Sequence, residues 1–187
     1  MDTVVEMAPS RAFARSAAQT ARLIAAGRLA QPRRMTAARL RFADGTTSVV
    51  FRETTIRGVE VPGPAVLVVG FQLRLIGRAQ FPHAVFRREC VLHTPLFAGF
   101  AGFRSKLWLA DEVTRGYHGV YQWAGADLAD RYATTLSELL DVVCVPGSVR
   151  YHVVADLTRG EYLAGVLAAP DGGSWWQLAA PVQRVPA

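Results

Sequence analysis

Three stretches of the chain repeat apolar residues at the three- and four-residue spacing of an amphipathic helix. Residues 10–30 have an alanine-rich apolar side and an arginine-rich side, and Pro32 ends the pattern. Residues 81–99 begin with a proline suited to a first helical turn. Residues 126–143 show the clearest stripe, and Pro146 and Gly147 follow it. The weak apolar side of the first helix favours docking on its own domain over binding a membrane surface or a partner.

Strict alternation of apolar and polar residues predicts strands in the remaining segments. Residues 38–56 alternate on both sides of Asp44-Gly45, which indicates a β-hairpin because glycine tolerates the positive φ of a tight turn. Further strands are predicted over 65–76, 103–110, 116–123 and 148–154. Residues 161–183 resemble a last hairpin that turns at Pro170–Gly173.

The order of elements from residue 65 to residue 156 is β-α-β-β-α-β, the arrangement of ferredoxin-like α+β folds. Right-handed crossovers place both helices of such a unit on one side of a four-stranded sheet. We therefore expect four parts: an N-terminal amphipathic helix (1–34), a hairpin extension (35–63), the main α+β domain (64–157) and a C-terminal hairpin tail (158–187).

Three segments, TPLFAGFAGFRSKLWL (94–109), YHGVYQWAGADLADRYA (117–133) and VPGSVRYHVV (145–154), resemble the dimeric α+β barrel proteins. Within that superfamily they are similar to the YdhR-like group of monooxygenase-like proteins and to actinobacterial relatives. The resemblance implies a homodimer in which two sheets meet as a barrel, with a pocket between each sheet and its own helices. Quinone-forming oxygenases and haem-degrading enzymes of the superfamily usually carry a polar trio with asparagine and tryptophan. This chain departs from that pattern because it contains no asparagine.

The alternation divides the four main strands into two faces. The face expected beneath the helices holds Leu67, Val69, Phe71, Leu73, Phe103, Leu107, Leu109, Tyr117, Tyr121, Trp123, Val149, Tyr151 and Val153. The opposite face is expected to hold Gln72, Arg74, Arg104, Lys106, Trp108, His118, Gln122, Arg150 and His152. The cations of this face are expected to be solvated, to pair with carboxylates across a dimer, or to hold an acidic ligand.

Candidate site residues follow from these faces. The predicted catalytic residues are His118, Tyr121 and Trp108, and the predicted substrate-binding residues are Arg104, Lys106, Trp123, Tyr132, Tyr151 and His93. A histidine suits general base catalysis because its ordinary pKa lies near neutrality, although a sheet histidine is also a common structural hydrogen-bonding residue. The aromatic residues are interpreted either as core or as the lining of a cavity for a flat aromatic substrate.

Composition narrows the classes of function. The chain has 187 residues, half of them hydrophobic, which suits one folded domain. No apolar run is long enough to span a membrane, and no secretory signal is evident at the start, so we expect a cytoplasmic protein. The net charge of +6 comes from dispersed arginines, and Lys106 is the only lysine. This dispersal favours an acidic or aromatic small molecule over nucleic acid as the partner.

Metal and nucleophile motifs are absent from the sequence. The two cysteines have no metal-binding spacing, and His83 and His93 fall on different sides of their predicted helix. Neither a G-x-S-x-G motif nor a phosphate-binding glycine loop occurs. We expect no metal and no cofactor.

Two hypotheses of different class remain. The first is a small-molecule enzyme of bacterial secondary metabolism, monooxygenase-like or cyclase/isomerase-like, acting on an aromatic or polyketide-like substrate. The second is a non-catalytic ligand-binding or assembly protein with a basic dimer interface. A cavity with convergent polar groups between sheet and helices would favour the first, and a filled core would favour the second.

Overall fold

The computed structural model describes residues 9–58, 62–74, 94, 97–111, 113–114, 116–170 and 172–182. Seven strands form one sheet: β1 (Leu29–Ala30), β2 (Arg39–Arg41), β3 (Thr47–Ile56), β4 (Pro64–Phe71), β5 (Phe103–Asp111), β6 (Tyr117–Ala124) and β7 (Arg150–Ala155). Their order is β1-β3-β5-β6-β4-β7, and β2 also pairs with β3. Every one of these pairings is antiparallel.

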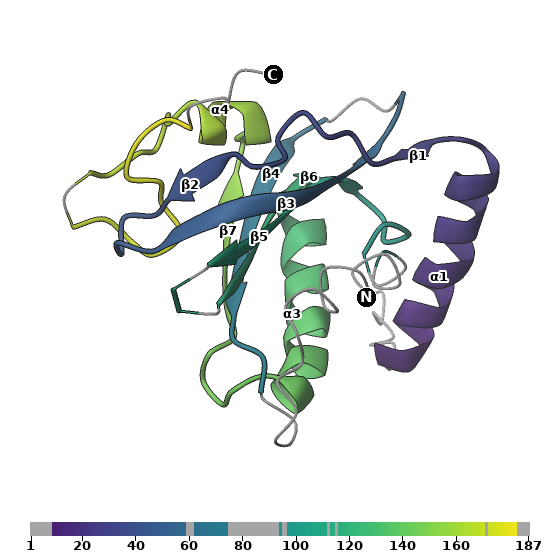
Figure 1. Cartoon of the computed structure of the whole chain (residues 1–187). Helices are drawn as coiled ribbons and strands as arrows, with labels where there is room; N and C mark the ends of the chain where they lie inside the picture. Colours follow the sequence, from purple (N-terminus) through teal and green to yellow (C-terminus); the bar gives the residue numbers. More distant parts are fainter. Residues whose placement is uncertain are drawn as a thin grey trace, which may run out of the picture.

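The strands β7, β4, β6 and β5 stand in the neighbour order of a ferredoxin-like unit, which confirms the predicted α+β class. Helix α3 (Ala126–Val143) connects β6 to β7 and covers one face of the sheet (Figure 1). Of the helix predicted over 81–99, the structure describes only residues 94 and 97–99, and the rest lies outside the described residues. Within the described ranges, no helix combines the length and apolar character needed to cross a bilayer.

The predicted hairpin extension is confirmed. Strands β2 and β3 pair, and Gly45 in the turn has a φ of 86°, where glycine avoids strain. The Asp44 carboxylate accepts hydrogen bonds from the backbone N–H and the hydroxyl of Thr46, which stabilises the turn. Because β3 also pairs with β5 along most of its length, the hairpin widens the four-stranded unit at one edge.

The N-terminal helix α1 (Pro9–Ala25) docks on its own domain, as its weak apolar side predicts. Ser16, Thr20 and Leu23 are buried, and the Phe13 ring lies edge-on to the Phe100 ring at 5.6 Å. The helix ends earlier than predicted because Gly27 takes up a left-handed conformation, with a φ of 63°. The stop expected at Pro32 is therefore wrong by about two turns.

Most of the sheet face opposite α3 is covered by the chain itself, so the prediction that this whole face looks toward a partner sheet or a ligand is wrong. Figure 1 shows the short helix α4 (Arg159–Leu163) and the C-terminal segment on this side, while α1 and α3 lie on the other. Together with the β2 region they cover the sheet residues Val66, Val68, Leu107, Leu109 and Val120. A dimer through this face would first have to displace the segment.

The C-terminal segment also differs from the predicted hairpin. A capping box, in which Thr158 and Glu161 bond each other's backbone N–H groups, starts helix α4 where a strand was expected. Beyond α4 the described chain runs in turns, and its hydrogen bonds include those from the Ala169 N–H to the Leu178 carbonyl and from the Val182 N–H to the Leu163 carbonyl. Leu178 also forms a bridge with Phe42. Tyr162, Trp175, Trp176 and Leu178 carry the apolar contact with the sheet.

Two polar contacts attach α4 to the sheet. The Arg159 guanidinium pairs with the Glu53 carboxylate of β3 at 2.6 Å, and both side chains are largely buried. The Gln122 side chain of β6 accepts from the Arg159 N–H and donates to the Ala65 carbonyl of β4 at 3.1 Å. Gln122, predicted to lie on an open face, therefore has a structural role.

The Glu53–Arg159 pair yields a stability prediction. We expect Glu53→Gln to lower the free energy of unfolding by about 3–5 kcal/mol, because it leaves a buried guanidinium without its counter-ion. Urea unfolding followed by circular dichroism measures this change. The matched control is Asp44→Asn, which breaks the more exposed Asp44–Arg150 pair and should cost at most about 1 kcal/mol. Equal costs for the two variants would contradict the role assigned to the buried pair.

The docking of α1 yields a second prediction. A Cβ atom at Gly99 would lie 1.9 Å from the Ser16 backbone oxygen, so Gly99→Ala should push α1 away from the domain. We expect a loss of about 1–3 kcal/mol and faster hydrogen exchange at the α1 amides. Gly160→Ala is the control, because its Cβ would approach nothing nearer than the Thr158 hydroxyl at 3.8 Å. Unchanged exchange in Gly99→Ala would show that α1 does not depend on this contact.

Candidate functional site: a cavity between the sheet and helix α3

An irregularity in β5 decides which side chains face α3. Phe103 pairs with Trp123, but Ser105 pairs with Gln122, so the register shifts by one residue at Arg104 and the alternation of side chains changes phase. Lys106 and Trp108 consequently lie on the α3 side, and Leu107 and Leu109 lie on the other. The predicted faces of β5 are therefore wrong beyond Arg104, whereas those of β6 are right.

The phase change places Lys106 and Trp108 in a cavity of about 320 Å³ between the sheet and α3. The described residues that line it are almost all apolar or aromatic: Phe71, Leu73, Phe97, Lys106, Trp108, Tyr121, Tyr132, Leu136, Leu139, Leu140 and Val143. Its volume is at the lower end of the roughly 300–1,000 Å³ typical of small-molecule pockets. A pocket between the sheet and a helix is what the barrel resemblance implies.

Lys106 contributes a buried ammonium group to this cavity. Its Nζ atom lies 3.1 Å from the centroid of the Trp108 ring and 4.6 Å from the centroids of Phe97 and Tyr121. The negative faces of aromatic rings attract a cation, by about 2 kcal/mol or more where water is excluded. The rings thus hold positive charge inside an apolar space, with only 5% of the residue exposed.

Three polar groups accompany the ammonium. Tyr132 of α3 hydrogen-bonds through its side chain with Tyr121 of β6, and burial, together with this neighbour, raises the pKa of Tyr132 well above its ordinary value. Tyr132 therefore remains a neutral phenol at physiological pH. The indole N–H of Trp108 is buried and has no hydrogen-bond partner among the described residues.

The other predicted binding residues are not among the described residues that line the cavity. Trp123 is fully buried behind it, with its ring 4.9 Å from that of Tyr132. Tyr151 lies on the α3 side at the outer edge, where its hydroxyl is 3.4 Å from the Thr134 hydroxyl. Arg104 lines a separate pocket beside α1. His93 lies outside the described residues.

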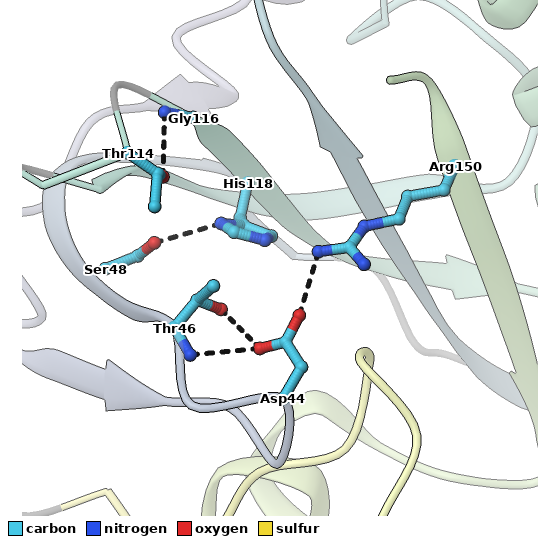
Figure 2. Close-up of polar contacts among 7 residues, drawn as sticks. All are labelled: Asp44, Thr46, Ser48, Thr114, Gly116, His118 and Arg150. Atoms are coloured by element: carbon cyan, nitrogen blue, oxygen red, sulfur yellow. Dashed lines mark hydrogen bonds and ion pairs between the residues drawn. The ribbon is translucent and has the colours of Figure 1, made fainter. Parts of the chain in front are cut away.

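His118 is on the opposite side of the sheet from Lys106, Trp108 and Tyr121, so the three predicted catalytic residues do not share one site. Its Nδ1 atom lies 2.9 Å from the Ser48 hydroxyl (Figure 2). Its ring stacks on that of Phe42, with the ring centroids 4.6 Å apart. Burial, followed by the nearby Arg150 cation, lowers the pKa of His118 to about 4. The imidazole is therefore neutral near pH 7, as expected of a structural histidine.

Sequence reasoning missed several residues that complete the cavity. Phe97 precedes β5 and contributes an aromatic wall against Trp108, with the ring centroids 5.2 Å apart. Leu136, Leu139 and Leu140 come from α3, and none of these leucines was assigned to a site from the sequence. No group of three or more metal-ligating side chains comes together in the described parts of the chain.

Comparisons with known proteins identify no family. No family model matches the chain, and no curated protein matches it. Similar solved structures include a ferredoxin-fold protein from Listeria monocytogenes related to antibiotic biosynthesis monooxygenases, with 14% identity over 59% of this chain and a TM-score of 0.41. A monooxygenase-like protein from Listeria innocua has 16% identity over 58% of this chain and a TM-score of 0.38.

An anthrone oxidase-like protein is 13% identical over 61% of this chain, with a TM-score of 0.37, and 59% of its own length is covered. The chain covers 64% of the Listeria monocytogenes protein and 63% of the Listeria innocua protein, which is just under two thirds of each.

Proposed function

We propose that the chain binds a flat aromatic or polyketide-like small molecule in the cavity beside α3 and acts on it as an enzyme of bacterial secondary metabolism. The reaction is monooxygenase-like or cyclase/isomerase-like. The observation that carries the proposal is the Lys106 ammonium, held by aromatic rings in an otherwise apolar cavity of about 320 Å³.

The shape and chemistry of the lining support this class of substrate. Flat rings stack favourably on Trp108, Phe97 and Tyr121, and the volume suits a molecule of one to three rings. A cation in a water-poor space favours a ligand with an ionised oxygen, such as a phenolate, an enolate or a carboxylate. An acidic aromatic molecule meets both conditions.

The same cation suggests the chemical role of the site. When a carbonyl compound loses a proton from the adjacent carbon, negative charge develops on its oxygen, and a preorganised cation stabilises that charge. A cyclase or isomerase returns the proton elsewhere, whereas a monooxygenase-like reaction lets the carbanion react with dioxygen. Lys106 would supply the charge, and the Trp108 N–H and the tyrosine pair would supply hydrogen bonds.

The described lining has no carboxylate and no imidazole, and Tyr132 stays protonated. These residues therefore serve to stabilise an anion and do not abstract the proton. His118, which sequence analysis favoured as the base, lies across the sheet from the cavity. The proposal accordingly assigns proton removal to water or to a group outside the described lining.

Binding of an acidic aromatic probe tests the role of Lys106. We expect Lys106→Met to weaken binding of salicylate by about tenfold or more, while binding of the neutral analogue salicylamide changes little, because only the charge is removed. Isothermal titration calorimetry measures both affinities. Arg104→Met is the control, since it removes a cation outside the cavity. If Lys106→Met weakened the binding of salicylate and salicylamide equally, or if Arg104→Met had the same effect as Lys106→Met, an electrostatic role for Lys106 would be refuted.

Turnover is tested with anthrone, a flat ketone. Its methylene group loses a proton to give an aryloxide, in which the negative charge lies on the oxygen of an aromatic ring. In deuterium oxide under nitrogen, we expect the protein to speed exchange at this methylene by about tenfold or more over buffer, and Lys106→Met to abolish the effect. Mass spectrometry measures the exchange.

In air, a monooxygenase-like reaction converts anthrone and one dioxygen into anthraquinone and one water, so oxygen consumption accompanies it. Exchange without oxygen consumption would favour the cyclase/isomerase class. Neither exchange nor oxidation, with salicylate binding intact, would instead support the ligand-binding alternative.

A further inference from the structure

A second cavity, of about 420 Å³, lies where β4 ends and where β6 and β7 begin. The turn between β5 and β6 and the segment after α3 meet there. Its walls combine polar side chains with two aromatic rings, Phe71 and Tyr117, which stack on each other at 5.7 Å. The polar wall residues are Thr46, Gln72, Thr114, His118, Ser148 and Arg150. The proposed function uses none of these polar groups.

The charges at this cavity compensate each other. The Arg150 guanidinium pairs with the Asp44 carboxylate at 2.9 Å, as Figure 2 shows, and its other face lies 4.3 Å from the Trp175 ring. Burial opposes ionisation of Asp44, but hydrogen bonds from Thr46 and Arg150 outweigh it and lower the pKa of the carboxyl group. The Arg150 guanidinium therefore lines the cavity with its charge already compensated by Asp44.

His118 adds a neutral wall. The ring is held by the Ser48 hydroxyl and by Phe42, and its Nε2 atom points toward the Arg150–Asp44 pair (Figure 2). Nε2 is buried without a hydrogen-bond partner among the described residues, which costs free energy unless water or a ligand hydroxyl satisfies it. Because the imidazole is uncharged, it does not bias the cavity toward an anion.

Three hydroxyl groups complete the polar lining. Thr46 donates to Asp44 at 2.6 Å, Thr114 accepts from the Gly116 N–H at 3.3 Å, and Ser148 lies 3.3 Å from the Gln72 carbonyl. A hydroxyl has one donor and two acceptor positions, so each of these retains capacity for a ligand. The wall thus offers donors and acceptors together.

From this arrangement we infer that the cavity binds a neutral polyhydroxylated ligand, a sugar ring or a glycosyl group, with its hydroxyls on Arg150, His118 and Thr114 and its ring carbons beside the aromatic wall. Asp44, which is not itself part of the lining, already compensates the charge of Arg150, so the wall favours neither an anion nor a cation. The hydroxyls of a polyol can instead accept from the guanidinium and bond to the imidazole Nε2 atom. The volume lies within the range of small-ligand sites.

Methyl β-glucoside and methyl β-glucuronide test this inference, since they differ by one carboxylate. We expect the full-length protein to bind the glucoside saturably, with amide shifts in a nitrogen–proton NMR spectrum confined to residues around the cavity, such as Thr46, Gly116 and Gly147. We expect the glucuronide to bind no more tightly. Absence of saturable shifts would overturn the inference, and tighter binding of the glucuronide would overturn the neutral class.

Side-chain variants sharpen the test. Thr114→Val should weaken glucoside binding about fivefold by removing one hydrogen-bonding group, and Arg150→Gln should weaken it further. Thr134→Val, on the exposed side of α3, is the matched control and should bind normally. If Thr134→Val weakened binding as much as Thr114→Val, the site would be misplaced.

An aryl glucoside separates a free sugar from a glycosyl substituent. Phe71 lines both cavities, so an aryl group attached to the sugar would lie near the wall that the two cavities share. Tighter binding of phenyl β-glucoside than of methyl β-glucoside would indicate a glycosyl group on an aromatic ligand, and equal binding would indicate a free sugar. Because salicylate binding depends on Lys106 and sugar binding does not, the two proposals fail independently.

Discussion

A one-residue shift of register at Arg104, between Phe103 and Ser105 of β5, determines the chemistry of the sheet. Without the change of phase that it causes, Lys106 and Trp108 would lie on the face buried by the C-terminal segment. With it, the only ammonium side chain enters a space lined by rings, and the leucines that follow it join the opposite core. A bulge of this kind disrupts the pairing at one residue and moves every later side chain of the strand to the opposite face of the sheet.

The change of face matters because both faces of the sheet are largely buried. A sheet with one open face could tolerate a charged residue on that face, but here helices cover one side and the C-terminal segment covers the other. Polar groups inside such a sheet must be satisfied or must serve a ligand. Glu53 pairs with Arg159, Gln122 bonds backbone groups, and Ser48 bonds His118, so these three residues hold the layers together.

Sequence alone predicted the order of the strands along the chain, the hairpin at Asp44-Gly45, helix α3 and the faces of β6, because each of these features rests on a local pattern. It placed the side chains of β5 wrongly, since a bulge is set by pairing with distant strands and leaves no local signal in FRSKLWL. The capping box at Thr158 and Glu161 was a usable signal for α4, yet the apolar residues after it resemble a strand.

The candidate site was predictable only in part. Lys106, Trp108, Tyr121 and Tyr132 were all chosen from the sequence and meet at one cavity, although two of them were assigned to the wrong face. The volume of the cavity depends on how the side chains of α3 and Phe97 fill the space, which alternation does not specify. The separation of His118 from Lys106 and Trp108 follows from the same shift in β5, whereas alternation along β6 separates His118 from Tyr121.

Lys106 is the only residue of the chain with an ε-amino group, and it is almost completely enclosed. Its reactivity toward acylating or alkylating reagents consequently depends on how often the aromatic enclosure opens. The rate at which a reagent modifies Lys106, followed by mass spectrometry, therefore reports how often the cavity opens. A ligand bound in the cavity would slow this rate, so the same measurement reports occupancy without an engineered tag.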